Sequence, residues 1–195
     1  MRDRRAMSLP IVDFFYDIVS PYSYVAAKRI HELDGLATVR WRPCLLGGVF
    51  KATGNTGPAF TVPAKMPYMF KDLSRLAAYY GFPLTVPKSF PANTVTVQRV
   101  LCAADEDQVP ALSMKLYDIY WGQGLDVSDS ITLTGLVGEA LMAKAGSDEV
   151  KARLRENTEA VVAAGGFGAP TFLLDGEMYF GEDRLFLLID RLKKA

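Results

Sequence analysis

An apolar run rich in aromatic residues, Ile11 to Tyr16, stops at Asp17, and a helical pattern opens three residues later at Ser20-Pro21. This order predicts a strand, a short turn and a helix. Serine suits the N-cap because its hydroxyl accepts from an unpaired backbone N–H, and proline suits the first helical position, where no N–H is needed. A helix that starts directly after a strand presents its positive end there, so this corner can hold an anion. Ser-Pro is also a common plain helix start, so the dipeptide alone leaves both interpretations open.

A second strand is predicted over residues 38–42, where polar and apolar side chains alternate after a break at Gly35. Two strands that flank one helix through short connections indicate a right-handed βαβ unit with a parallel strand pair. The chain end predicts a different motif. Asp175-Gly176 separates two short apolar runs, residues 171–174 and 177–180, which is a strong signal for a β-hairpin.

A final helix is expected to begin near Glu182-Asp183, and Ala169-Pro170 introduces the first hairpin strand, where a proline can be cis. Between the two ends, helical patterns are expected at 66–80, 93–105, 110–122, 132–145 and 147–164. The glycine-rich segment 46–65 is predicted to be a long functional loop. The order βαβ, helices, ββα indicates an α/β chain with a thioredoxin-like fold and a large all-helical insertion. We expect a discontinuous thioredoxin-like domain, 9–45 and 165–195, around an insertion domain, 46–164.

Composition excludes several classes of function. Lysine plus arginine equals aspartate plus glutamate, 22 each, so a nucleic-acid partner is poorly supported. No uninterrupted apolar segment follows the N-terminal arginines, because Asp13 interrupts the first apolar run. We therefore expect no signal peptide, no membrane partner and a cytoplasmic protein.

The cysteine and histidine content restricts the chemistry further. Cys44 and Cys102 are far apart, no C-x-x-C occurs, and His31 is the single histidine. These counts argue against dithiol redox chemistry, a Ser-His triad and a zinc site built from cysteine and histidine; no metal is expected. Cys44 is expected to be a small buried thiol. An enzyme with this sequence would have to take its nucleophile or base from a bound small molecule.

Four separated motifs resemble a known family over residues 11–192: DFFYDIVSPYSYVA, KATGN, PAKMPYMFKDLSRLA and GFGAPTFLLDGEMYFGEDRL. The chain resembles the kappa-class glutathione transferases and 2-hydroxychromene-2-carboxylate isomerases, which are related to the bacterial disulfide oxidoreductases. In the oxidoreductases a C-x-x-C occupies the corner where this chain has Ser20-Pro-Tyr-Ser23. The substitution removes the protein thiol from that corner.

The resemblance implies a role for each matching position. Ser20 would be the catalytic residue that donates a hydrogen bond to the thiolate of bound glutathione. The other implied glutathione-binding residues are Pro21, Tyr22, Asn55, Lys65, Ala169, Pro170, Glu182 and Asp183. Among them, Lys65 would pair with the glycyl carboxylate, the backbone of Ala169 with the cysteinyl part, and the two acids with the γ-glutamyl end. An acid in a first helical turn is also favourable without a ligand. Phe50, Phe60 and Phe90 are candidates for an aromatic substrate pocket, although core packing explains each equally well.

The resemblance favours a glutathione-dependent isomerase that acts on a small aromatic catabolite and functions as a homodimer. By this analogy the reaction would convert 2-hydroxychromene-2-carboxylate to trans-o-hydroxybenzylidenepyruvate by reversible thiolate addition. A kappa-like transferase that conjugates glutathione to electrophiles would use the same site. A non-catalytic glutathione-binding module is a third possibility, and a thiol-disulfide oxidoreductase is disfavoured because the cysteine pair is missing.

Overall fold

A four-stranded sheet forms the centre of the computed structural model, which describes residues 9–194. The strand order is β2-β1-β3-β4; β1 pairs with β2 in parallel and with β3 antiparallel, and β3 pairs antiparallel with β4. The strands are β1 (Ile11–Tyr16), β2 (Thr38–Pro43), β3 (Thr171–Leu174) and β4 (Glu177–Phe180). The predicted parallel pair and terminal hairpin are both confirmed. The N-terminal arginine segment, on which the expected absence of a signal peptide depended, lies outside the described residues.

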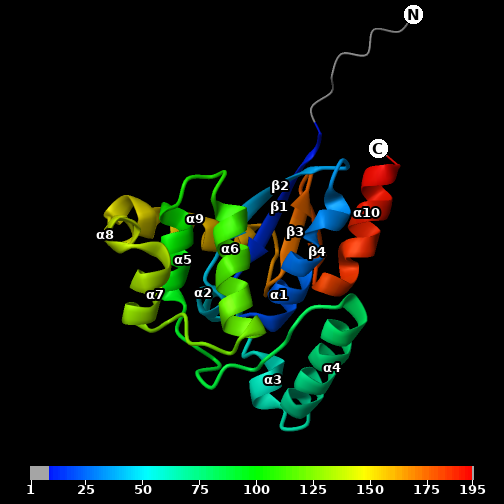
Figure 1. The fold of residues 1–195 in the computed structure, drawn as a ribbon. Coiled ribbons are helices and arrows are strands. Elements are labelled where there is room, and N and C mark those ends of the chain that lie inside the picture. Colours follow the sequence, from blue (N-terminus) through cyan, green and yellow to red (C-terminus); the bar gives the residue numbers. More distant parts are fainter. Residues whose placement is uncertain (1–8, 195) are drawn as a thin grey trace, which may run out of the picture.

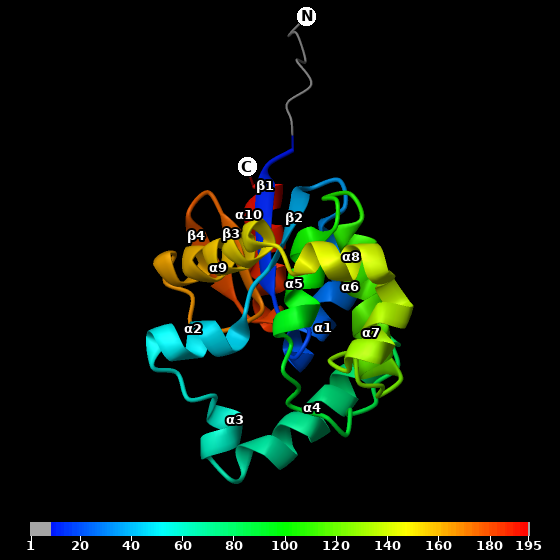
Figure 2. The ribbon, with the colours of Figure 1, turned by 90° about the vertical axis from the view of Figure 1, so that its left-hand side faces the viewer.

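Helices cover both faces of the sheet. Helix α1 (Pro21–Lys28) and helix α10 (Leu185–Lys193) lie on one face, and α9 (Asp148–Ala163) crosses the other, as Figures 1 and 2 show. A short 3₁₀ turn, Ile30–Leu33, follows α1, and another, Glu182–Arg184, leads into α10. This is the thioredoxin-like architecture with added helices that the element order predicts.

The hairpin turn and the first helix form where local sequence signals place them. Asp175 and Gly176 both have positive φ, 52° and 82°, as a two-residue turn between twisted strands requires. Ser20 is the N-cap of α1 and its Oγ accepts a hydrogen bond from the Ser23 N–H at 3.2 Å. The Ala169-Pro170 peptide is cis, as is Phe90-Pro91.

The helical section between the two halves of the sheet matches the predicted pattern with two differences. The predicted helix 132–145 is divided at Gly138, and the predicted helix 110–122 changes to π-helical geometry for its last five residues. The helices of this section are α4 (Lys65–Tyr80), α5 (Val95–Ala103), α6 (Val109–Tyr117) with the π-helical turn Asp118–Gly122, α7 (Ser130–Val137) and α8 (Glu139–Ala145).

The segment 46–65, predicted to be a loop, is largely helical, so that prediction was wrong. It contains α2 (Leu46–Thr53) and α3 (Pro58–Thr61). Helix α2 could not be predicted from its local sequence, because it contains two glycines, which disfavour a helix, and has no capping side chain at Leu45. Its stability comes from tertiary contacts: Val49 is buried with Phe15, and the Thr158 hydroxyl of α9 accepts from the Leu45 N–H at 3.0 Å.

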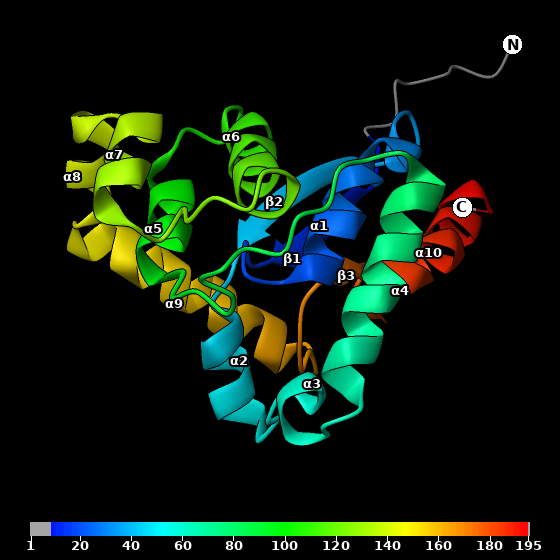
Figure 3. The ribbon, with the colours of Figure 1, turned by 60° about the horizontal axis from the view of Figure 1, so that its bottom comes forward.

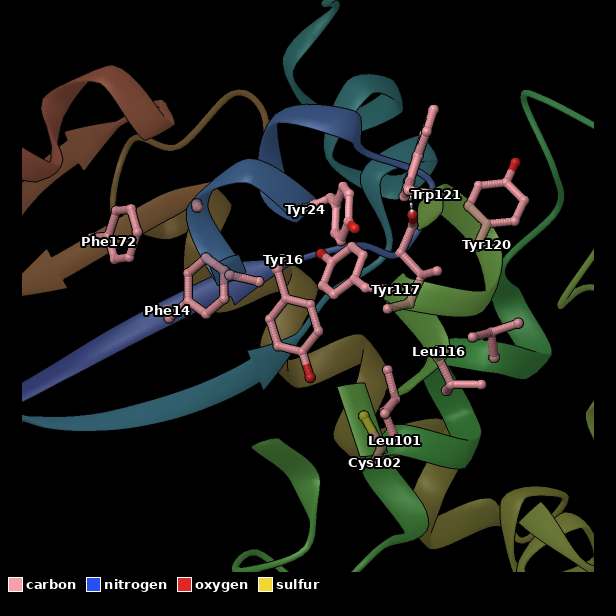
Figure 4. Close-up of a cluster of buried hydrophobic side chains, with 14 of the residues drawn as sticks. Phe14, Tyr16, Tyr24, Leu101, Cys102, Leu116, Tyr117, Tyr120, Trp121 and Phe172 are labelled. Atoms are coloured by element: carbon pink, nitrogen blue, oxygen red, sulfur yellow. Dashed lines mark hydrogen bonds between the residues drawn. The ribbon is translucent and has the colours of Figure 1, made fainter. Parts of the chain in front are cut away.

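The core is aromatic, and its polar atoms connect the helical section to the end of β1. Phe14 stacks between Tyr16 and Phe172, with ring centroids 5.0 and 4.9 Å away. Figure 4 shows Tyr16 beside Tyr117, with Phe14 and Phe172 on one side of this pair and Trp121 on the other. The Tyr117 hydroxyl donates to the Asp17 carbonyl at 3.1 Å, and the Trp121 indole N–H donates to the Ile18 carbonyl at 2.8 Å. The residues just after β1 are therefore fixed by buried hydrogen bonds.

Two smaller features of the described residues are relevant to function. Cys44 is buried and burial raises the pKa of its thiol, so the expected small buried thiol is confirmed. Within residues 9–194, every helix is too short or too polar to cross a membrane.

Candidate functional site

The turn between β1 and α1 places Ser20 at the inner end of a cavity. Ser20 is only 3% exposed, and its Oγ donates to the Ala169 carbonyl at 3.0 Å while it accepts from the Ser23 N–H. The two ends of the chain thus meet at this point: the N-cap of α1 and the residue before cis-Pro170. The hydroxyl lies beside the unpaired N–H groups of the first turn of α1, where the helix dipole favours a negative charge. Ser23 is fully buried, so its hydroxyl does not line the cavity.

The cavity has a volume of about 800 Å³ and is lined mainly by apolar side chains. Its walls come from the starts of α1, α2 and α5, from α3 and the first turns of α4, and from the segment before β3. Figures 2 and 3 show α2, α3 and α4 as an arc below the sheet. Pockets of roughly 300–1,000 Å³ are typical for small molecules. The arc therefore surrounds a site large enough for a small organic ligand.

Nine of the twelve residues predicted for the site line this one cavity. They are Ser20, Pro21, Tyr22, Phe50, Asn55, Phe60, Lys65, Phe90 and Ala169. Pro170 follows Ala169 directly but does not line the cavity, and neither do Glu182 and Asp183. The roles assigned to all twelve remain predictions.

An aromatic wall stands on the side of α3 and α4. The rings of Phe60 and Phe90 stack with centroids 6.0 Å apart, and Phe70 meets Phe90 edge-on at 5.6 Å. Gly57, at φ 67°, allows Phe50 and Phe60 to approach each other: a Cβ at this position would lie 3.0 Å from one ring and 3.2 Å from the other. Phe60 is 49% exposed, which is unusual for a core residue. Its exposed ring face could stack on a flat apolar ligand.

The polar residues around the wall are few. Asn55 connects the α2–α3 turn to the strand side, because its Nδ2 donates to the Phe167 carbonyl at 2.8 Å and its Oδ1 accepts from the Gly57 N–H. Lys65 is exposed in the first turn of α4, where a positive charge is unfavourable for the helix. A cation that remains at a helix N-terminus beside a cavity suits an anionic ligand.

Tyr22 lies between the cavity and α4. Its hydroxyl donates to Asp72 Oδ2 at 3.4 Å, and burial together with Asp72 raises the pKa of the phenol to about 12. Tyr22 is therefore a neutral phenol at physiological pH, which can donate a hydrogen bond but cannot serve as a base.

Glu182 and Asp183 occupy a separate place behind α1. The Glu182 carboxylate is buried and accepts from Arg29 Nη1 at 2.7 Å, while Arg29 also pairs with Glu32 and lies under the Tyr80 ring. Burial raises the pKa of Glu182 and the Arg29 charge opposes this shift. Asp183 is exposed and pairs with Arg184. In this arrangement the Glu182 carboxylate joins α1 to the start of α10.

Sequence reasoning missed several residues that line the cavity, above all Asp17 and Thr94. Asp17 carried a signal, since an acid directly after a buried apolar strand is unusual for a core position. Thr94 carried none, because only the tertiary structure brings the start of α5 to the end of β1. Leu45, Leu46 and Gly47 were missed because α2 was taken for a loop.

The chain also matches known proteins. The model of the DSBA-like thioredoxin domain family matches residues 11–193, nearly the whole length. The chain belongs to this family.

Within the family, the chain groups with two kinds of enzyme. It is 34% identical over 188 residues to a 2-hydroxychromene-2-carboxylate isomerase of Pseudomonas putida, covering 91% of this chain and 92% of the relative. It is 33% identical over 201 residues to a glutathione S-transferase kappa 1 of Rattus norvegicus, covering 91% and 88%. The solved structure of a 2-hydroxychromene-2-carboxylate isomerase superposes with a TM-score of 0.85 at 33% identity, covering 94% of this chain and 95% of that one. The suspected resemblance to these two groups is thereby confirmed.

Proposed function

We propose that this DSBA-like protein is a glutathione-dependent cis-trans isomerase of a small aromatic compound, 2-hydroxychromene-2-carboxylate, which it converts to trans-o-hydroxybenzylidenepyruvate. The observation that carries the proposal is the position of the Ser20 hydroxyl. It is buried at the N-terminus of α1, 3.0 Å from the Ala169 carbonyl, at the inner end of an apolar cavity. The similarity to named isomerases and to kappa glutathione transferases supports the same assignment.

The proposed binding mode uses groups that already face one another. The cysteinyl N–H of glutathione would donate to the Ala169 carbonyl, replacing the Ser20 hydroxyl, which would then be free to donate to the thiolate. The N-terminus of α1 lowers the pKa of a thiol at this place. Lys65 and Asn55, which both line the cavity, would bind the glycyl end. Ser20 thus orients and stabilises a thiolate supplied by the ligand, and is not itself the nucleophile.

In the proposed reaction the hemiketal ring first opens: the bond between C2 and the ring oxygen breaks, the 2-hydroxyl proton goes to the released phenol oxygen, and the carbonyl of the cis enone forms. The thiolate then attacks the conjugated carbon of this enone, forming a C–S bond and moving the electron pair of the double bond onto the carbonyl oxygen as an enolate. The former double bond is now single and rotates. Collapse of the enolate restores the double bond in the trans geometry and expels the thiolate, so glutathione is regenerated. Dividing one difficult isomerisation into two easier steps is the advantage of covalent catalysis.

A second candidate, glutathione transfer to an uncharged electrophile, uses the same site without expulsion of the thiol. The charge of the cavity favours it: within the described residues, Lys65 is the sole cationic side chain of the lining, and the proposed binding mode assigns it to glutathione. A carboxylate-bearing substrate would then be bound without a cationic side chain, by backbone N–H groups and neutral donors of the lining such as the Tyr22 hydroxyl. A non-catalytic glutathione-binding module is the remaining alternative.

The ultraviolet spectrum of 2-hydroxychromene-2-carboxylate, followed with the enzyme and with or without catalytic amounts of glutathione, tests the proposal. We expect an acceleration that depends on glutathione and leaves its concentration unchanged. No glutathione-dependent acceleration would overturn the isomerase assignment. Faster conjugation of a chloronitrobenzene would move the assignment to transferase, and tight glutathione binding with neither activity would favour the module.

A further inference from the structure

Asp17, the residue directly after β1, has a fully buried carboxylate that lines the cavity three residues before Ser20. Both carboxylate oxygens accept hydrogen bonds. Oδ2 accepts from the Leu46 N–H at 2.8 Å, and Oδ1 accepts from the Thr94 hydroxyl at 2.7 Å and the Val19 N–H at 3.1 Å. Two of the three donors are backbone groups that cannot act as acceptors, so the geometry fits an ionised carboxylate.

The three donors belong to three segments that form the inner walls. Val19 precedes Ser20, Leu46 is the first residue of α2, and Thr94 is the N-cap of α5. Helix α2 has no capping side chain of its own at Leu45, and Asp17 takes over this task from another part of the chain. The Thr94 side chain turns to Asp17 and makes no cap bond to α5.

The buried anion carries a desolvation cost, although an apolar residue in its place would leave the Leu46 and Val19 N–H groups without this acceptor. No lysine or arginine of the described residues forms an ion pair with Asp17. Burial raises the pKa of the carboxyl, and only the three hydrogen bonds oppose this shift. The positive N-termini of α2 and α5 offset part of the desolvation cost. No ion pair among the described residues offsets the remaining cost, and the three donors come from three different segments, so we explain the carboxylate by the geometry it imposes on them.

We infer that Asp17 is a positioning residue of the glutathione site, whose carboxylate holds the starts of α2 and α5 against the Ser20 turn and thereby sets the spacing between the thiolate position and the α2–α3 segment that carries Phe50 and Asn55. The inference rests on the proposed use of glutathione. Asp17 itself makes no contact with ligand in this scheme. It acts through Val19, Leu46 and Thr94.

Asp17→Asn is the most informative substitution because it keeps the shape and removes an acceptor. Whichever way the amide is turned, its NH₂ group faces either the Leu46 N–H or the Val19 N–H, so one backbone donor loses its partner. Thr94→Val removes one of the three donors without changing the volume. Matched controls are Asp13→Asn, which removes a carboxylate from the same strand where it pairs with Arg40, and Thr96→Val on the exposed face of α5.

The experiment measures glutathione Kd by calorimetry, KM and kcat with the aromatic substrate, and urea unfolding for the wild type and all four variants. We expect Asp17→Asn to raise glutathione Kd and KM about tenfold, the change that loss of one charge-assisted hydrogen bond gives. kcat should change much less, and Thr94→Val should raise Kd a few-fold. Both controls should bind like the wild type. Folded Asp17→Asn and Thr94→Val proteins with unchanged Kd and KM would overturn the inference.

If Asp17→Asn does not fold, the Thr94→Val result decides by itself, since the same few-fold rise in Kd is expected and its absence overturns the inference. A wild type that binds no glutathione overturns the proposed function, and this inference with it. Wild-type binding with unaffected variants overturns the inference alone.

The pH dependence of Kd gives a readout that a purely structural role would not move. In the wild type, glutathione Kd should rise as the pH falls through the pKa of Asp17, because the protonated carboxyl loses an acceptor. Asp17→Asn should lack this acid limb, and Asp13→Asn should retain it. The other titratable groups around Asp17 are Tyr16, Cys44, Tyr117 and Tyr120, and the pKa of each is raised. All four are therefore neutral in the acid range. The glycyl carboxylate of glutathione and Glu182, whose pKa is raised, titrate in every variant, so an acid limb of the same midpoint and size in the wild type and in Asp17→Asn would contradict the inference.

Discussion

The inner end of the cavity and its outer wall are built in different ways. At the inner end, Asp17, Ser20 and Thr94 are buried and every named side chain is held by hydrogen bonds to another segment. On the outer wall, Phe60 and Lys65 are exposed, and Phe60 is held only by ring stacking. Under the proposed function, the difference shows where precision is needed: the glutathione thiolate would have to be placed to within a fraction of an ångström, whereas the aromatic substrate would need only a flat surface.

Ser20→Ala should have the largest effect, because it removes the hydroxyl that is proposed to donate to the glutathione thiolate. We expect kcat/KM to fall about a hundredfold or more, the usual loss when one preorganised donor to a developing charge is removed. Loss of the cap should cost only ~1 kcal/mol of folding stability. Steady-state kinetics measure the first effect and urea unfolding the second, and the thiolate absorbance of bound glutathione, titrated with pH, tests the hydrogen bond to the thiolate. Full activity in Ser20→Ala would show that the hydroxyl has no role at the thiolate.

Glu182→Ala should have the second-largest effect. Glu182 belongs neither to the inner end of the cavity nor to its outer wall. The substitution leaves the buried Arg29 charge with one carboxylate fewer, and breaking a buried pair costs about 3 kcal/mol. Urea unfolding measures the loss. Glu159→Ala, which removes an exposed pair with Arg155, is the control and should unfold like the wild type. A Glu182→Ala protein of wild-type stability would mean that Arg29 does not depend on this partner. A raised glutathione KM, measured at a temperature where the variant is fully folded, would support the predicted γ-glutamyl contact.

Phe60→Ala addresses the outer wall. Removing a half-exposed ring that stacks on Phe90 should raise KM for the aromatic substrate about tenfold, while glutathione Kd and kcat stay nearly constant. Phe186→Ala, on α10 and outside the cavity lining, provides a matched loss of an exposed ring. If Phe60→Ala lowered kcat as strongly as Ser20→Ala, the claim that the inner end needs precise placement and the outer wall does not would be wrong.

Lys65→Met should have the smallest effect. The side chain is exposed, so its attraction for a carboxylate is screened by water and salt, and glutathione KM should rise only a few-fold. The difference from the wild type should shrink as salt is added. Lys71→Met, an exposed lysine of α4 outside the lining, should behave like the wild type at every salt concentration. A salt-independent loss in Lys65→Met would indicate packing of its aliphatic chain rather than charge.

The parts of this molecule that could be predicted from sequence are those fixed by neighbouring residues. Ser20 caps α1, and Asp175 and Gly176 adopt the positive φ angles of the hairpin turn. Ser147 caps α9, because its side chain accepts a hydrogen bond from the Val150 N–H. Apolar periodicity likewise located α4 to within one residue at its start.

The parts that could not be predicted depend on distant residues. Helix α2 has a cap from Asp17 and a packing partner in α9, neither of which its own sequence shows. The involvement of Glu182 with Arg29 is of the same kind, since 153 residues separate the two. For the candidate site, the family resemblance supplied the lining residues near each motif, while Asp17 and Thr94 became visible only when the strand end and the start of α5 were seen together.

The hydrogen bond between Ser20 and Ala169 has a consequence for how the protein is made. It joins residues 149 apart, and the bonds of Asp17 to Leu46 and Thr94 span 29 and 77 residues. Contacts between residues so far apart in sequence form slowly, because the intervening chain loses conformational entropy before the contacts contribute any stabilising free energy. During synthesis, the Ser20 turn leaves the ribosome long before its partner on the other side of the cavity exists. In the proposed binding mode the Ala169 carbonyl pairs with glutathione, so we expect binding only after β3 has joined the sheet, and binding would then report that both ends of the chain have come together.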